Sequence, residues 1–247
     1  MQSLSPVFLL VLALQLAIAQ DNLNFNNFVD TFASCKWDSP DFDACIKNAL
    51  NTCRAYFKTG IPELSISPFD PFFAKEIVQT RGGSNFNYRL KLINVSEYGW
   101  TDSIVTKFKS NRNKRWLQYS QFFPEKWLDG EYEFQGKVMN RNIDNKGAWN
   151  LTLYDYIQTT TVSRPSNTGN IKVRIEVQSI GDMKLHVSHL LRGRTFMENV
   201  LDRMINASWR PGFAVVRPLV NDMVSTAFTE IFNNNFKDLD LNTILPN

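Results

Sequence analysis

The chain has 247 residues, of which 43% are hydrophobic and 19 are phenylalanine, and its formal net charge at pH 7 is +3. Such a composition provides for a substantial apolar core in one large domain or two small ones. The small net charge excludes the strongly basic class of chain that binds nucleic acid through its phosphates.

Residues 1–19 have the pattern of a secretory signal peptide. Val7 to Ala19 is an apolar run, and Ala17-Ile18-Ala19 matches the small-x-small sequence that precedes signal peptidase cleavage. The run is shorter than the roughly 20 residues that a membrane-spanning helix needs, although Met1 to Pro6 lacks the usual Lys or Arg. We therefore expect residues 1–19 to be removed and residues 20–247 to form a single secreted domain.

Three cysteines allow one intramolecular disulfide in an oxidising compartment. Ser39-Pro40-Asp41 predicts a helix start, and an apolar stripe follows at helical spacing: Ile46, Ala49, Leu50, Cys53 and Phe57. On one continuous helix Cys45 and Cys53 would lie about 12 Å apart, which is too far for a disulfide. Cys35 and Cys45 are therefore the favoured pair, and Cys53 is expected to be a buried, unreactive thiol.

Three glycosylation sequons, at Asn94, Asn150 and Asn206, fit the same compartment. A glycan requires its asparagine to face solvent. Asn150 meets this condition, because it alternates with the apolar residues of a predicted strand. Asn94 shares the parity of Leu90 and Leu92, so that either a bulge or strand end lies near it or the sequon is silent.

Alternation with a period of two predicts a series of strands after the first helix. Short polar turns separate the runs and favour antiparallel hairpins, because parallel crossovers would need a helix between strands. Residues 104–123 stay ambiguous, since both parities carry aromatic residues. The apolar positions of the predicted strands are Phe86, Tyr88, Leu90 and Leu92; Tyr132, Phe134, Gly136 and Val138; Trp149, Leu151 and Leu153; Ile171, Val173, Ile175 and Val177; and Met183, Leu185 and Val187.

The last quarter of the chain predicts a long amphipathic helix, in two runs that begin at Phe196 and Phe213. Polar residues such as Asn221, Asp222 and Ser225 interrupt the second run too often for it to span a bilayer. Pro218 is expected to bend this helix or to mark a break after Trp209. The predicted fold is α+β, a highly curved antiparallel β-sheet wrapped around the long C-terminal helix.

Several motifs, taken together in order, resemble those of the insect takeout and haemolymph juvenile hormone-binding protein family. They are Cys35-x9-Cys45 with Asp41-Phe42-Asp43 between the thiols, Gly60-Ile61-Pro62-Glu63-Leu64, Pro68-Phe69-Asp70-Pro71-Phe72, Asp129-Gly130-Glu131-Tyr132 with Gly136, Asn206-x2-Trp209 with Pro218, and Ile244-Leu245-Pro246. The second cysteine pair of the haemolymph hormone carriers is missing, which favours the takeout branch. Ser67 stands where the family often has a proline, and Cys53 is an additional thiol.

The resemblance implies a fold like half of a bactericidal/permeability-increasing protein, with an apolar tunnel that carries lipophilic molecules. Each residue of the expected tunnel wall is equally compatible with ordinary core packing. The Tyr132 hydroxyl is either a polar handle for a carbonyl or epoxide or, as its residue type favours, a satisfied core phenol. The expected wall residues are Tyr132, Phe134, Val138, Trp149, Leu151, Leu153, Phe213, Val216, Val220, Met223, Val224, Phe228 and Ile231.

No pattern in the sequence favours an enzyme. His186 and His189 are spaced for opposite faces of a strand, so no metal site is expected. There is no Gly-x-Ser-x-Gly elbow, phosphate loop or Cys-His constellation. A basic cluster, Lys107, Lys109, Arg112, Lys114 and Arg115, is either a solvated hairpin tip or a contact for an anionic membrane.

The sequence thus predicts a secreted, glycosylated, non-enzymatic carrier of small hydrophobic ligands, such as juvenile-hormone-like terpenoids, fatty acids or other lipids. It is expected to need no cofactor and no metal, to bind no nucleic acid and to be a monomer. The alternative is an extracellular interaction or signalling protein with a filled core, which acts at a receptor or by transient contact with a membrane surface.

Overall fold

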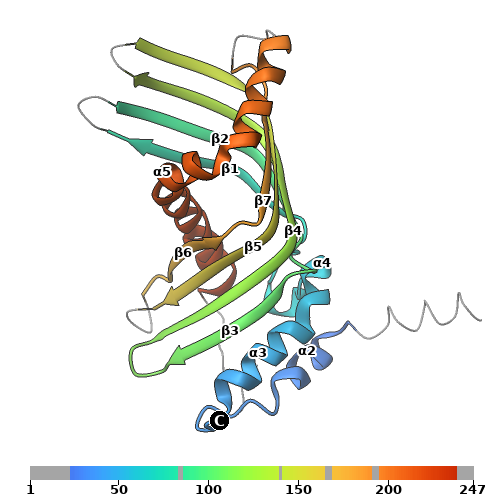
Figure 1. Ribbon diagram of the computed structural model, residues 1–247. Coiled ribbons are helices and arrows are strands. Elements are labelled where there is room, and N and C mark those ends of the chain that lie inside the picture. The colour runs from blue at the N-terminus through green and yellow to red at the C-terminus, as the bar shows by residue number, and fades with distance from the viewer. Residues whose placement is uncertain (1–22, 83–85, 139–140, 165–168, 191–194, 238–247) are drawn as a thin grey trace, which may run out of the picture.

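The computed structural model describes residues 23–82, 86–138, 141–164, 169–190 and 195–237, so the predicted signal peptide lies outside the described residues. Figure 1 shows a strongly curved sheet with a long helix on its concave side and short helices at one end. The elements are α2 (Phe25–Phe32), α3 (Phe42–Thr52), 3-10 turns at Cys53–Ala55 and Pro62–Leu64, α4 (Tyr56–Thr59), β1 (Phe72–Arg81), β2 (Phe86–Tyr98), β3 (Ile104–Asn111), β4 (Trp116–Val138), β5 (Arg141–Ser163), β6 (Lys172–Ser179), β7 (Asp182–Val187) and α5 (Thr195–Phe236).

Within the described residues, seven strands form one antiparallel sheet. The strand order is β1-β2-β4-β5-β6, while β3 pairs with β4 and β7 pairs with β5. The long central strands β4 and β5 stay in register along their whole length, from Trp116 opposite Ser163 to Val138 opposite Arg141. The predicted antiparallel, curved sheet is therefore confirmed.

The two central strands change their inward-facing parity at the same level. On β4, Phe123 is buried, Pro124 and Glu125 are both exposed, and Lys126 is buried. The inward-facing parity of the partner strand β5 also changes, around Asp155, whose φ of 48° lies in the left-handed region. Because both strands shift together, the sheet bends without losing its pairing, which gives the curvature seen in Figure 1.

The predicted irregularity at Asn94 is present. The pairing of β2 with β4 shifts register between Ile93 and Ser96, and Asn94 has a φ of 53°. Asn94 is exposed, whereas its neighbour Val95 is buried. The bulge therefore turns the sequon outward, as the sequence required of an acceptor at this position.

Helix α5 runs as one element with a kink. Its backbone is non-helical at Ser208 (φ −129°, ψ 22°), and it contains Pro211 and Pro218. A proline cannot donate to the carbonyl four residues earlier and its ring clashes there, so the distortion falls just before Pro211. The sequence predicted either a bend at Pro218 or a break after Trp209. The break lies next to Trp209, one residue earlier than predicted, and the backbone at Pro218 is helical. Figure 1 shows the change of direction between the orange and red parts of α5.

A ladder of polar side chains on α5 covers the free edge of β6. Four residues of helix rise about 6 Å and two residues of strand about 6.6 Å, so side chains at every fourth helical position meet alternate strand residues. Each accepts a backbone N–H of β6 or of the residue before it: Asn221 from Val177 (3.1 Å), Ser225 from Ile175 (2.8 Å), Thr229 from Val173 (3.0 Å) and Asn233 from Ile171 (2.9 Å).

Single asparagines act in the same way at two other strand edges. The Asn51 amide on α3 accepts from Val105 N–H (2.8 Å) and donates to its carbonyl (3.0 Å) on β3. The Asn206 amide on α5 accepts from Leu185 N–H (2.8 Å) and donates to its carbonyl (3.0 Å) on β7. An amide side chain carries both a donor and an acceptor, so it replaces one peptide of a missing neighbouring strand.

Thr229→Val is expected to lower the free energy of unfolding by about 1–3 kcal/mol, because the buried Val173 N–H loses its acceptor while the side-chain shape is kept. Thr226→Val is the matched control, since the exposed Thr226 bonds only to Asp222 O within its own helix. Urea unfolding of both variants measures the difference. Equal losses in the two variants would show that the ladder does not hold α5 to β6.

The opposite edge of the sheet meets α5 through fewer contacts. Gln79 on β1 donates to the Leu219 carbonyl (3.1 Å), and Arg81 forms an exposed ion pair with Asp222 (2.8 Å). Helix α5 thus touches β6 on one side and β1 on the other, and it closes the open side of the curved sheet.

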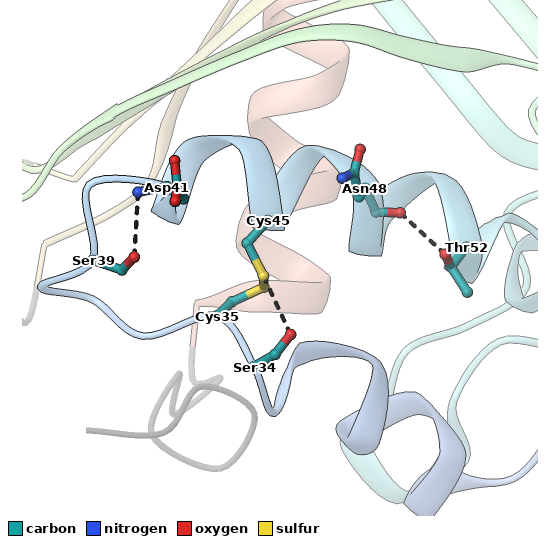
Figure 2. The surroundings of a disulfide bond; sticks show 7 residues. All are labelled: Ser34, Cys35, Ser39, Asp41, Cys45, Asn48 and Thr52. Atoms are coloured by element: carbon teal, nitrogen blue, oxygen red, sulfur yellow. Dashed lines mark hydrogen bonds between the residues drawn. A yellow bond between two sulfur atoms is a disulfide. The ribbon is translucent and has the colours of Figure 1, made fainter.

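The N-terminal helices cover one end of the sheet, where α3 lies against β3. Cys35 and Cys45 form a disulfide with a Cα–Cα distance of 5.4 Å, the pairing that the sequence favoured, and it ties α3 to the chain that follows α2 (Figure 2). Ser39 Oγ accepts the Asp41 N–H (3.2 Å) at the start of α3. Cys53 is a buried free thiol, and burial raises its pKa to about 11.

Candidate ligand-binding interior

The space between α5 and the concave face of the sheet is lined by two apolar clusters. The lower cluster, toward the N-terminal helices, is built around Phe123, Ile175 and Phe228. The upper cluster is built around Leu92, Val95 and Tyr132, and Met223 of α5 packs against it. Helix α5 contributes to both, so it forms a common wall along the interior.

The lower cluster has a dense aromatic centre. Phe228 lies within 5.7–6.4 Å, between ring centroids, of Phe69, Phe72 and Trp100. Trp100 also contacts Phe123 edge-on (5.2 Å). Only 4% of Phe228 is exposed, so this part of the interior is a packed core.

The upper part of the interior is less completely buried. Phe134, Trp149 and Met223 face inward and pack against the upper cluster, yet each is only half-buried. Val220 and Val224 on α5 are also half-buried, at the margin of the lower cluster. Inward-facing apolar side chains are normally the most completely buried residues of a domain, so partial exposure here marks incomplete packing.

Most of the predicted wall residues gather on these two clusters. Leu153, Phe228 and Ile231 are buried in the lower cluster, and Leu151, Phe213, Val220 and Val224 pack against it; Tyr132 is buried in the upper cluster, with Phe134, Trp149 and Met223 against it. Val216 differs, since 42% of it is exposed. The side chain of Val138 lies outside the described residues.

A buried ion pair lies at the bend of the sheet and was not predicted. Lys126 on β4 pairs with Glu97 on β2, and 5% and 9% of their side chains are exposed. The Lys126 ammonium also lies 4.1 Å from the ring centroids of both Trp100 and Phe123. Burial lowers the pKa of Lys126, and the nearby Glu97 carboxylate only partly opposes this.

The neighbouring tyrosine shares this environment. Burial raises the pKa of Tyr156 above its ordinary value, and the Glu97 charge adds to the effect. Its hydroxyl donates to Gln158 Oε1 (3.1 Å). Tyr156 therefore stays protonated and acts as a structural hydrogen-bond donor.

Tyr132 is a satisfied core phenol. Its hydroxyl donates to the Ser188 carbonyl (2.8 Å), and 6% of the residue is exposed. Burial, with a contribution from Glu198, raises its pKa. The geometry thus agrees with the core interpretation, and it gives no support to a polar handle for a ligand.

A separate groove of about 740 Å³ lies outside this interior, between β6 and α5. Most of its lining residues are of polar or charged type, and none of the predicted wall residues line it. Lys172, Arg174, Asp222 and Thr226 are among its residues, and Arg174 and Asp222 are paired with Glu176 and Arg81.

The two histidines take no part in a common site. His186 pairs with Asp202 of α5, and His189 lies beside Ser188 Oγ (3.0 Å). In the part of the chain that the structure describes, no three His, Cys, Asp or Glu side chains are grouped to hold a metal ion. No helix among the described residues combines the length and the apolar character that crossing a membrane requires.

The fold and its interior define a class of proteins in which a curved antiparallel sheet encloses a long C-terminal helix around an apolar interior. The chain belongs to the haemolymph juvenile hormone binding protein family, whose model matches residues 8–246. This confirms the predicted family, while the preference for its takeout branch stays a prediction.

A solved structure shows the same architecture. The crystal structure of Epiphyas postvittana Takeout 1 is similar at a TM-score of 0.58 and 14% identity, over 83% of this chain and 96% of that one. A lipopolysaccharide binding protein gives a weaker likeness, with a TM-score of 0.29 and 9% identity over 81% of this chain and 40% of that one. No curated protein matches the chain by sequence.

Proposed function

We propose that this protein is a secreted carrier of small hydrophobic molecules, held between α5 and the concave face of the sheet. The family is named for binding a hormone in haemolymph, which supports an extracellular carrier. The observation that carries the proposal is the partial burial of inward-facing apolar residues such as Trp149, Val224 and Met223. A ligand in the upper interior would complete their burial.

The burial of apolar surface alone can account for the free energy of ligand binding. Burying on the order of 400 Å² of ligand surface contributes roughly 10 kcal/mol at about 25 cal/mol per Å². The cost of association removes several kcal/mol, which leaves micromolar to sub-micromolar affinity. Because apolar contacts dominate, selection would follow the length and shape of the ligand, and terpenoids, fatty acids and other lipids of suitable size would compete.

Val220→Trp is expected to weaken the binding of a fluorescent fatty-acid probe at least about tenfold. The larger ring would occupy space at the half-buried margin of the interior. Val215→Trp on the same helix is the matched control, since 78% of Val215 is exposed. Unchanged probe binding in a folded Val220→Trp variant would contradict a ligand at this wall. Phe228→Arg is unsuitable, because Phe228 belongs to the packed core and its replacement would test folding.

Native mass spectrometry of the purified protein separates this proposal from the alternative, a filled core that acts through its surface. A stoichiometric lipid released from the protein would support the carrier.

We further propose glycans on Asn94 and Asn150, which are both exposed, in preference to Asn206, whose amide already bonds to both backbone groups of Leu185.

A further inference from the structure

The convex face of the sheet carries two exposed aromatic side chains. Among the residues whose side chains the structure describes, Phe73 on β1 (57% exposed) and Trp127 on β4 (39%) are the only exposed aromatic residues. Neither belongs to an apolar cluster of the interior. The register of the sheet shows which residues lie beside each of these rings.

Trp127 lies beside a glycosylation sequon on the neighbouring strand β5. It is paired with Thr152, the third residue of the Asn150 sequon. Asn150 itself is paired with Asp129, so Trp127 is its diagonal neighbour on β4. Diagonal neighbours on one face of an antiparallel pair lie about 7–8 Å apart, within reach of long side chains. Asn150 is exposed, so a sugar on its amide and the Trp127 ring would share one face of the sheet.

The orientation of the Trp127 ring leaves one of its faces toward this sequon. Trp127 stacks on Tyr98 of β2, with ring centroids 3.5 Å apart and an interplanar angle of 4°. Strands β2 and β5 flank β4 on opposite sides (Figure 1). The ring face that is turned away from Tyr98 is therefore turned toward β5, which carries Asn150. Thr152, the residue opposite Trp127, is too small to cover that face.

A second sequon on this face has a similar arrangement. Phe73 is paired with Ser96, the third residue of the Asn94 sequon. The bulge between Ile93 and Ser96 breaks the register at Asn94, so pairing does not set the position of Asn94 relative to Phe73. The register fixes a diagonal contact at Asn150 alone, and Phe73 serves as the comparison ring.

We propose that an N-glycan on Asn150 folds back on the sheet, and that its first N-acetylglucosamine ring covers the free face of Trp127. A pyranose ring presents several C–H groups on one side, and these carry partial positive charge that matches the negative face of an indole. The contact also removes apolar surface of both rings from water. The proposal rests on the glycan proposed above for Asn150, and it is independent of the ligand in the interior.

Charges beside Trp127 favour the glycan over a membrane or a second copy of the chain. Glu125 and Asp129 precede and follow Trp127 on the outward side of β4. A lipid surface or a symmetric interface that covered Trp127 would take these carboxylates out of water, which costs free energy when they are unpaired. A neutral sugar covers the ring and leaves both carboxylates hydrated.

A cycle of variants in protein secreted from insect cells tests the contact, after peptide mass spectrometry has established whether Asn150 carries a glycan. Asn150→Gln is expected to lower the folding equilibrium constant, measured by urea denaturation, by about two- to tenfold, as for the loss of a contact to an aromatic face. In the Trp127→Ala background the same change should have little effect. In the Phe73→Ala background the full loss should remain, because Phe73 lies away from Asn150.

Hydroxyl-radical labelling measures the same contact without replacing Trp127. Oxidation of Trp127 is expected to increase in Asn150→Gln, which lacks the glycan. Protein produced without glycosylation in the bacterial periplasm is the matched control, since Asn150→Gln should change neither stability nor labelling there. Protection of Trp127 that persists in the insect-cell Asn150→Gln protein would assign the ring to another partner and overturn the proposal.

The remaining outcomes separate this proposal from those on which it rests. An occupied Asn150 whose loss costs the same with and without Trp127 would overturn the stacking contact and leave the glycan in place. An unoccupied Asn150 would overturn both. All variants are expected to bind the fatty-acid probe as the wild type does, so that the carrier function is tested separately.

Discussion

Glu97→Leu is expected to lower the free energy of unfolding by about 3–5 kcal/mol, because it leaves the Lys126 ammonium buried without its partner. Chemical denaturation at pH 7 measures the loss. The double variant Glu97→Leu/Lys126→Met should recover most of it, since an apolar pair of similar volume leaves no charge uncompensated. A double variant as unstable as the single one would show that packing, and not charge, sets the cost.

The same variant has a predicted pH dependence. Without Glu97, burial is the main influence on Lys126, and it lowers the pKa of this side chain below that in the unfolded chain. Above the lowered pKa the folded protein binds fewer protons than the unfolded one, so its stability increases with pH. Glu97→Leu should therefore lose less stability, relative to wild type, at about pH 9.5 than at pH 7.

Phe228→Ala is also expected to lower the free energy of unfolding by about 3–5 kcal/mol, because it opens a cavity at the centre of the lower aromatic cluster. Phe73→Ala is the control, since 57% of Phe73 is exposed and the change should cost less than about 1 kcal/mol. Thermal or urea unfolding compares the two. A small effect at Phe228 would mean that the lower interior is not tightly packed.

The sequence predicted those features that repeat along a single element. The helical spacing of Val220, Val224 and Phe228 places them on one side of α5, and all three face the interior. Alternation likewise identified the inward faces of β6 and β7. These periods follow from backbone geometry alone, so they survive in the sequence whatever the tertiary context.

Features that depend on two elements were missed for a physical reason. The parity change at Pro124 and Glu125 interrupts the alternation on which strand prediction relies. Residues 104–123 were ambiguous because aromatic residues occupy both parities. Glu97 and Lys126 come together only through the pairing of β2 with β4, which no local pattern reveals. Helix α2, which contributes Phe28 and Phe32 to the N-terminal core, was not predicted.

The polar residues of α5 show how one pattern admits two interpretations. In the sequence, Asn221 and Ser225 interrupt an apolar face and exclude a membrane span. In the structure they fall on the side of the helix that meets β6, where their polarity is required. The sequence shows that these polar residues are present, but it does not show which backbone groups they bond to.

The side chains that cover the edges of β3, β6 and β7 also bear on solubility at high concentration. An uncovered strand edge is a template onto which another molecule can add a strand, the first step toward amyloid-like polymers. Asn51, Asn206 and the α5 ladder occupy those backbone groups from within the chain. These contacts therefore disfavour the addition of a further strand at the edges of β3, β6 and β7.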